Sequence, residues 1–431
     1  MIKKSLIRSL AFVAGITLAP GVFATNGYFA HGYGNKSKGM AGAGVALPQD
    51  AMAAATNPAG MAFVGTRFDL GLAALRASVG YSASGASGPL APPAFNLENG
   101  AYESDNTLFF VPHLAYNRML DADQAIGVAV YANGVSTKYP AGATPSGLGT
   151  FYGGTAGIDL SQIFIVPTYA VKLTPTAAVG ISPILVYQRF KAYGLSQFGG
   201  FSTDAGKLSD NGYDTSTGVG LRLGGQMDAS PNLSLGASYQ TRTAMSKFDK
   251  YAGLFAEGGD LDVPPSAVIG AAFKLAPGRA IVFDVQRIEY SKVKSLGNPM
   301  NPSLAGCAGG NAAQCLGGND GSGFGWRDMT IYKVGYQQQW SAQTAWRLGY
   351  SKANQPVPES EVLFNILAPI VTQEHYTLGW TWTTGGGEIN LEAMYAPKNT
   401  VRGNNPLAAG NQTIELSMKQ YELELSWAWK F

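Results

Sequence analysis

Few residues in this sequence have types suited to catalysis. The 431-residue chain contains three histidines, His31, His113 and His375, and two cysteines. A lipid hydrolase would need a serine or aspartate activated by a histidine base. None of the three histidines lies near a Gly-x-Ser-x-Gly turn, the setting that usually holds such a serine. We therefore predict that the protein is not an enzyme.

The two cysteines lie eight positions apart, at Cys307 and Cys315, in a segment rich in Gly and Asn. A metal site would need further ligands, and no histidine is nearby. In an oxidising compartment, the default for such a pair is a disulfide that closes a small loop. We predict this disulfide and expect neither a metal nor a cofactor.

The N-terminus indicates export. Its first eight residues include three basic side chains, residues 10–18 are apolar, and residues 22–24 fit a cleavage site. We predict that residues 1–24 are a signal peptide and that the mature chain begins at Thr25. The mature chain then has 27 basic and 28 acidic residues. A charge near −1 does not favour nucleic acid as a partner.

Composition indicates how the exported chain meets the membrane. Charged residues make up 13%, aromatic residues 11%, and there are 56 glycines, yet mean hydropathy is only +0.01. Beyond the N-terminus there is no uninterrupted apolar run long enough for a membrane helix. A transmembrane β-barrel has this composition, because its strands alternate lipid-facing and lumen-facing residues.

The strand pattern runs from about residue 66 to the C-terminus. The last segment places large apolar residues on one face and small or polar residues on the other, and it ends in Phe431. Aromatic residues at the ends of such faces are typical of the girdles at membrane interfaces. The segment's apolar face consists of Tyr421, Leu423, Leu425, Trp427, Trp429 and Phe431.

Turn signals set the number of strands. Six short turns alternate with seven long polar or Gly-rich loops, which gives thirteen connections and therefore fourteen antiparallel strands over residues 66–431. Residues 25–65 are rich in Gly and Ala and cannot form a core of their own, so we predict a partly helical plug inside the lumen. The predicted short turns are 119–123, 173–176, 228–232, 276–279, 341–343 and 384–387.

Two loop segments are candidates for ligand capture. Phe248, Tyr251 and Phe255 have helical spacing and would give a short helix one apolar face. This face could form an outer hydrophobic groove, or it could simply pack on the barrel rim. Residues 362–367 form a second apolar cluster with the same two interpretations.

Alternation directs several charged side chains into the lumen. One cation could hold a ligand carboxylate, but pairing with plug residues such as Lys36, Lys38 and Asp50 is the simpler interpretation. The inward-facing charges are Arg222, Lys333, Arg347, Glu388, Glu392, Glu422 and Glu424.

Several motifs resemble those of one family. Residues 25–34 (TNGYFAHGYG), 38–46 (KGMAGAGVA) and Asn57-Pro58-Ala59-Gly60 are similar to the plug of the FadL/TodX outer-membrane transporters. Further matches are Gly325-Trp326, Asn365–Pro369 and the closing aromatic strand. The resemblance implies a fourteen-stranded barrel in the outer membrane of a Gram-negative cell.

The resemblance also implies a route and a set of site residues. Hydrophobic molecules such as long-chain fatty acids would enter an outer groove and reach a pocket near the mature N-terminus. They would leave sideways through a kink in the third strand, for which Asn133-Gly134 is the candidate, because this pair readily adopts positive φ and would break the ladder. The residues assigned to binding and gating are Thr25, Asn26, Phe29, Asn57, Pro58, Ala59, Ala132, Asn133 and Gly134.

Two alternatives stay open at this stage. The protein could be a general diffusion porin, or a channel specialised for aromatic hydrocarbons. For the hydrophobic-compound channel, the expected partners are hydrophobic ligands, outer-membrane lipids and lipopolysaccharide, and the barrel-assembly machinery acting through Phe431.

Overall fold

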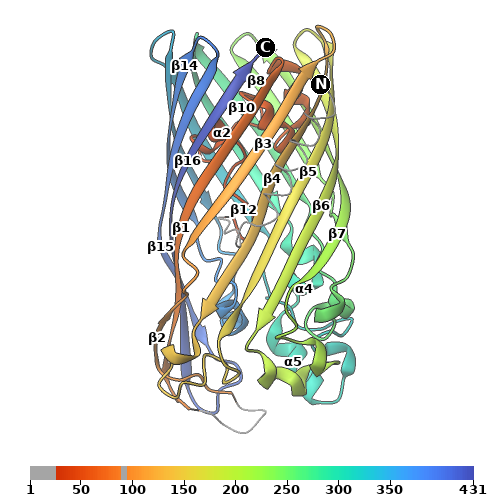
Figure 1. Cartoon of the computed structure of the whole chain (residues 1–431), viewed down its shortest axis with the longest axis vertical. Coiled ribbons are helices and arrows are strands. Elements are labelled where there is room, and N and C mark those ends of the chain that lie inside the picture. The colour runs from red at the N-terminus through yellow and green to blue at the C-terminus, as the bar shows by residue number, and fades with distance from the viewer. Residues whose placement is uncertain (1–25, 89–94) are drawn as a thin grey trace, which may run out of the picture.

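A closed antiparallel β-barrel makes up most of the protein (Figure 1). The computed structural model describes residues 26–88 and 95–431, so the predicted signal peptide and Thr25 lie outside the described residues. Fourteen strands follow one another around the wall, and β16 pairs with β1 from Arg67↔Lys430 to Gly85↔Gln412. The predicted fold and strand number are confirmed.

The elements have the following bounds. The wall strands are β1 (Arg67–Gly85), β3 (Leu108–Met119), β4 (Gln124–Tyr139), β5 (Ala156–Thr174), β6 (Ala177–Tyr193), β7 (Asp214–Ser230), β8 (Leu233–Gln240), β10 (Ser266–Ala276), β11 (Arg279–Ile288), β12 (Met329–Gln339), β13 (Thr344–Ala353), β14 (Glu374–Thr384), β15 (Gly387–Asn404) and β16 (Gln412–Lys430). Two short strands, β2 (Gly100–Glu103) and β9 (Ala244–Met245), pair with β1 and β7 near the loops. The helices are α2 (Asn35–Lys38), α3 (Ala256–Gly259), α4 (Lys294–Gly297) and α5 (Met300–Ala308). The 3₁₀ turns are η1 (Ala51–Ala55), η2 (Pro58–Phe63), η3 (Ala141–Ala143), η4 (Ser196–Phe201), η5 (Ala205–Lys207), η6 (Asp249–Tyr251), η7 (Tyr290–Lys292), η8 (Ala312–Gln314), η9 (Glu359–Glu361) and η10 (Phe364–Ile366).

Strand β16 shows how alternation builds the wall. Its outward side chains are large and exposed, with Leu423 at 60% and Leu425 at 58%. Its inward side chains, among them Glu422 and Glu424, are buried. Alternation therefore produces an apolar outer face without any continuous apolar run.

None of the helices among the described residues is long and apolar enough to span a membrane.

Connections differ between the two ends of the barrel. The six predicted short turns lie at the end where the C-terminus lies, and the long loops with α4 and α5 lie at the other end (Figure 1). Within the loops, Cys307 at the end of α5 is disulfide-bonded to Cys315.

Residues 26–65 lie inside the barrel, in the space that the wall encloses. There α2 and the first two 3₁₀ turns are visible behind the strands (Figure 1). Most of these residues are buried although the segment has little regular structure. The Asn57 side chain caps η2 by accepting a hydrogen bond from the Ala59 N–H, and its amide donates to the Val45 and Gly225 carbonyls at 2.8 and 3.1 Å. The Asn-Pro-Ala motif thus fixes the segment to β7.

Glycines in the wall make room for this segment. A Cβ at Gly224 would lie 2.1 Å from Asn57 Oδ1 and 2.7 Å from Pro58 Cδ. On the opposite wall, a Cβ at Gly349 would lie 2.2 Å from the Met40 carbonyl carbon. These distances are much shorter than van der Waals contact. The segment can therefore pack here only because Gly224 and Gly349 have no side chain.

Gly224 and its neighbour Gly225 provide a matched test. Gly224→Ala should lower the melting temperature of the detergent-purified barrel and increase proteolysis of residues 26–65, because the new methyl group displaces the Asn57–Pro58 turn. Gly225→Ala should leave both unchanged, because the nearest atom to its Cβ is 4.0 Å away. Equal effects of the two substitutions would contradict this account.

Candidate functional site

The strand ladder is incomplete between β3 and β4. The two strands pair only from Met119↔Ala125 to Leu114↔Val130. Beyond Val130, β4 stays paired with β5 as far as Tyr139↔Ala156, while β3 continues along β1. The wall therefore opens between β3 and β4 over several residues on the loop side.

Strand β4 changes character at this opening. Every residue from Ala129 to Thr137 is buried, so the alternation of exposed and buried residues stops. Neither Asn133 nor Gly134 has positive φ, and both stay in register with β5. The expectation that Asn133-Gly134 breaks its own strand was wrong: the missing ladder results from the departure of β3, which leaves the backbone of β4 extended.

The N-terminal segment contacts the free edge of β4. The Gly134 N–H donates to the Tyr28 carbonyl at 3.3 Å. The Asn133 side-chain oxygen accepts from the Ala30 N–H at 3.3 Å and the Tyr33 hydroxyl at 3.1 Å. Asn133 is fully buried, so this polar side chain replaces part of the lost strand pairing.

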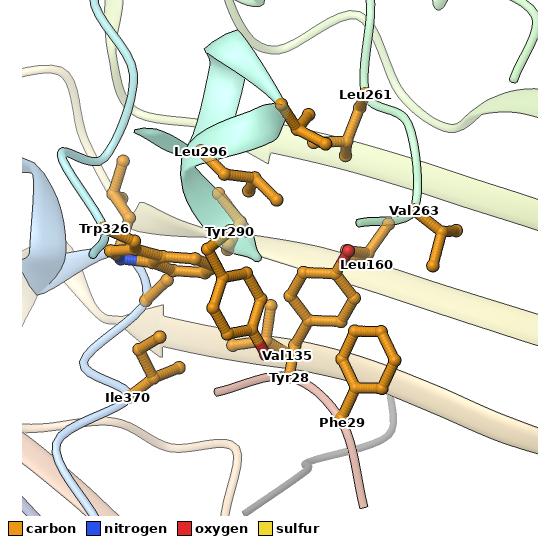
Figure 2. Packing of buried hydrophobic residues seen from close by; sticks show 14 of the residues in the cluster. Tyr28, Phe29, Val135, Leu160, Leu261, Val263, Tyr290, Leu296, Trp326 and Ile370 are labelled. Carbon is orange, nitrogen blue, oxygen red and sulfur yellow. The ribbon is translucent and has the colours of Figure 1, made fainter. Parts of the chain in front are cut away.

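An aromatic cluster lies directly beside this contact (Figure 2). The Tyr28 ring lies 5.7 Å from Tyr290 and 6.1 Å from Trp326, measured between ring centroids. The Tyr290 hydroxyl donates to the Asn26 carbonyl at 2.6 Å, and Phe29 packs on the Tyr290 edge. Burial raises the pKa of Tyr28 well above its usual range, so its phenol stays neutral in this apolar setting.

A second apolar site lies among the long loops. Its cavity has a volume of about 40 Å³, and no charged residue lines it. Because that volume is close to one water's share of liquid, about 30 Å³, a ligand must separate the side chains on entering. The lining residues are Ile158, Phe190, Leu195, Phe198, Leu208, Leu254, Phe255, Ser295, Leu316, Ser322, Gly323, Phe324, Phe364 and Leu367.

The predicted groove residues lie close together, but not on one helix. Phe248, Tyr251 and Phe255 surround the Phe190 ring at centroid distances of 5.7, 4.9 and 4.7 Å. Only Asp249–Tyr251 form a 3₁₀ turn, and the backbone is extended at both Phe248 and Phe255, so the predicted amphipathic helix was wrong. Phe248 and Tyr251 have no exposed surface, and only Phe255 lines the cavity.

A polar cavity adjoins Phe29 on the other side of the N-terminal segment. Its walls include Arg222 and Lys333. Arg222 donates to the Ala54 carbonyl and the Tyr131 hydroxyl at 3.1 and 3.2 Å, and Lys333 donates to the His31 carbonyl at 3.0 Å. Both cations are therefore held by neutral oxygens.

The structure distributes the predicted site residues over distinct places. Asn26, Phe29 and residues 132–134 meet at the opening beside β4, whereas residues 57–59 dock the N-terminal segment against β6 and β7. Sequence reasoning missed Tyr28 and Tyr290 as site residues. Trp326 was noted only as part of a motif, and its indole N–H donates to Asn365 Oδ1 of another noted motif at 2.6 Å.

Comparison with known proteins identifies the architecture. The family model described as outer membrane protein transport protein (OMPP1/FadL/TodX) matches residues 10–426. The chain belongs to the FadL/TodX family. It is therefore an outer-membrane channel for hydrophobic compounds, and proteins of this family are transport channels, not enzymes.

Solved structures agree with this assignment. The chain is similar to the toluene transporter TodX of Pseudomonas putida (TM-score 0.66, 17% identity, covering 93% of this chain and 99% of that one). It is also similar to the toluene transporter TbuX of Ralstonia pickettii (0.63, 17%, 95% and 100%). A FadL homologue of Pseudomonas aeruginosa gives 0.63 at 15% identity, over 96% and 100%. No curated protein sequence matches the chain.

Asn133 offers a test of how this FadL/TodX chain holds its N-terminal segment. Asn133→Ala removes the acceptor of two partly buried donors, and leaving such a group unsatisfied costs up to about 1–3 kcal/mol. Hydrogen exchange of residues 26–34 should accelerate while exchange in β5 and β6 stays slow. Asn99→Ala, at an exposed asparagine bonded to the Gly85 carbonyl, is the control and should change neither. Unchanged exchange in Asn133→Ala would contradict the proposed contact.

Proposed function

We propose that this channel takes up a hydrophobic compound at the loop cavity and releases it sideways into the membrane between β3 and β4. The observation that carries the proposal is the β3–β4 ladder, which ends at Leu114↔Val130 while β4 continues beside β5. Residues 26–65 would act as the plug that prevents straight passage through the lumen.

An apolar surface connects the two ends of the proposed route. Ile158 lines the loop cavity, and Leu160, two residues further along the same face of β5, lies in the aromatic cluster with Tyr28 and Val135 (Figure 2). Val135 belongs to the part of β4 that β3 has left. A ligand moving along this surface would stay out of water throughout.

Sideways release is favourable on physical grounds. Burying each CH₂ group gains about 0.8 kcal/mol, so transfer into lipid is downhill and needs no energy source at the barrel. Release into the aqueous periplasm would forfeit that gain.

The substrate class depends on where a carboxylate could bind. The loop cavity has no charged lining residue, so it suits an aromatic hydrocarbon as well as an acyl chain. The polar cavity beside Phe29 contains Arg222 and Lys333, which could hold a fatty-acid carboxylate. TodX and TbuX, to which this chain is similar, are toluene transporters, so aromatic hydrocarbons and fatty acids are both candidate substrates.

A bulky side chain at the opening should block release. Ala132 has the outward register at this point and is only 6% exposed. Ala132→Trp should reduce uptake of the substrate into proteoliposomes about tenfold, equivalent to about 1.4 kcal/mol. Ile163→Trp, at the paired outward position on β5, is the control and should leave uptake unchanged.

The porin alternative predicts a different result. Full uptake by Ala132→Trp, together with a large stable conductance and permeation of small sugars, would contradict lateral release and favour a diffusion pore.

Arg222 distinguishes the two substrate classes. Arg222→Gln should weaken oleate binding about tenfold and leave toluene binding unchanged, because only oleate carries a charge for the cation to hold. Arg347→Gln is the control, since this buried lumen arginine binds Gln49 and Thr381 away from the cavity. Oleate binding that is unaffected by Arg222→Gln would argue against a carboxylate at this site.

A further inference from the structure

Three buried glutamates lie side by side on the inner face of the wall. Glu392 on β15 is directly opposite Glu424 on β16, and Glu422 is two residues from Glu424 on the same face. Glu392 and Glu424 have no exposed surface, and Glu422 is 6% exposed. Like charges directly opposite each other on neighbouring strands are destabilising, so the glutamates must be balanced by cations or by protons.

The N-terminal segment supplies one cation. The Lys38 ammonium lies 2.8 Å from Glu422 Oε1 and 2.7 Å from Glu424 Oε2. Lys38 is the last residue of α2, and the next residue, Gly39, packs closely against the backbone of β14 at Gly379, which holds Lys38 near the wall. Lys38 therefore compensates one of three negative charges.

Glu392 is left without a comparable partner. Neither of its carboxylate oxygens accepts a hydrogen bond from any residue in the described part of the chain. The His31 ring lies beside it: His31 Nε2 is 3.7 Å from Glu392 Oε1 and also has no hydrogen-bond partner among the described residues. An ionised carboxylate buried in this way is strongly disfavoured unless it gains a proton or a neighbouring cation.

Charge counting gives the size of the deficit. With neutral histidines, three glutamates and Lys38 leave two uncompensated negative charges. His113, whose Nδ1 lies 3.7 Å from Glu424 Oε1, adds no charge when neutral. Other nearby lumen cations already have acidic partners: Lys36 and Arg67 contact Glu388, and Lys333, which donates to the His31 and Gly42 carbonyls, lies opposite Asp284 on the neighbouring strand. One divalent cation would make the cluster neutral.

The donor atoms match a particular kind of cation. His31, Glu392 and Glu422 each offer one ligand atom, and these atoms all lie within 4.8 Å of one another. One imidazole nitrogen with carboxylate oxygens suits Zn²⁺ and similar transition metals, whereas Ca²⁺ and Mg²⁺ prefer oxygen alone. Glu422 can take part because Lys38 contacts only one of its oxygens.

We infer that His31, Glu392 and Glu422 form a binding site for one divalent transition-metal ion, with Zn²⁺ as the best match. The ion would join the N-terminal segment to β15 and β16. His31 is two residues from Phe29 and three from Tyr28, so the bound ion would also hold the segment that contacts the free edge of β4.

The test measures binding directly and does not depend on transport. The untagged full-length mature protein, purified in detergent and stripped with EDTA, is dialysed against Zn²⁺ and analysed for metal. We expect one Zn²⁺ per chain, and a rise in melting temperature on Zn²⁺ addition that EDTA reverses. Ca²⁺ and Mg²⁺ at the same concentration should produce neither effect.

Variants locate the site. Glu392→Gln and His31→Gln should each weaken Zn²⁺ binding by at least about tenfold and abolish the Zn²⁺-dependent melting shift. Glu388→Gln is the matched control: it lies on the same strand, four residues away, and is already paired with Lys36 and Lys430. It should bind Zn²⁺ like the unmodified protein.

Two results would overturn the inference. One is the absence of stoichiometric Zn²⁺ in the unmodified protein, which would mean that protons neutralise the glutamates. The other is equal Zn²⁺ binding by His31→Gln, Glu392→Gln and Glu388→Gln, which would place the metal elsewhere. Two independent ligand variants keep the test valid if one of them fails to fold.

Discussion

The structure depends on a constraint set by lipid: backbone N–H and C=O groups inside a membrane must find hydrogen-bond partners within the protein. Closing β16 onto β1 satisfies this constraint around nearly the whole wall. Between β3 and β4 the ladder ends early, and the protein compensates locally. The Tyr28 carbonyl accepts from the Gly134 N–H, and the buried side chain of Asn133 takes two further donors. A gap in the wall and the position of the N-terminal segment are therefore two aspects of one arrangement.

Two kinds of contact hold the N-terminal segment in the barrel: buried ion pairs and close packing against glycines. On one side, lysines of α2 meet carboxylates of β15 and β16, with Lys36 on Glu388 and Lys38 on Glu422 and Glu424. Elsewhere the segment lies against glycines such as Gly224 and Gly349, where any side chain would collide. Buried ion pairs contribute little net stability, but a buried charge left without its partner is strongly destabilising. These ion pairs therefore favour one position of the segment against β15 and β16. Around Glu392 the glutamates outnumber the cations, because Lys38 contacts Glu422 and Glu424 only; this surplus is the basis for the proposed metal ion.

Much of the fold could be predicted from the sequence because a barrel strand has a period of two. The alternation in β16, the six short turns and the fourteen strands all follow from local pattern. The pairing of lumen charges with Lys36 and Lys38 also followed from alternation, which assigns each side chain a face. Local pattern failed where backbone geometry was inferred from residue type: Asn133-Gly134 stays extended, and residues 248–255 form no single helix. Residue type gives a preference of about 1 kcal/mol, and neighbouring strands or packed aromatic rings override it.

The barrel and the face of each strand that points outward could be predicted from the sequence, because they depend on periodicity and local turns. The family could be predicted from short motifs. Only the tertiary structure decided where β3 leaves β4, because that depends on register between segments and not on the residues of either strand. It also brought Asn26 to Tyr290, 264 positions apart, and Trp326 to Asn365. Likewise, His31 meets Glu392 only because the chain returns to the lumen wall after a full circuit of the barrel. Contacts of this kind carry no local signal, since each partner taken alone is an ordinary polar or aromatic residue.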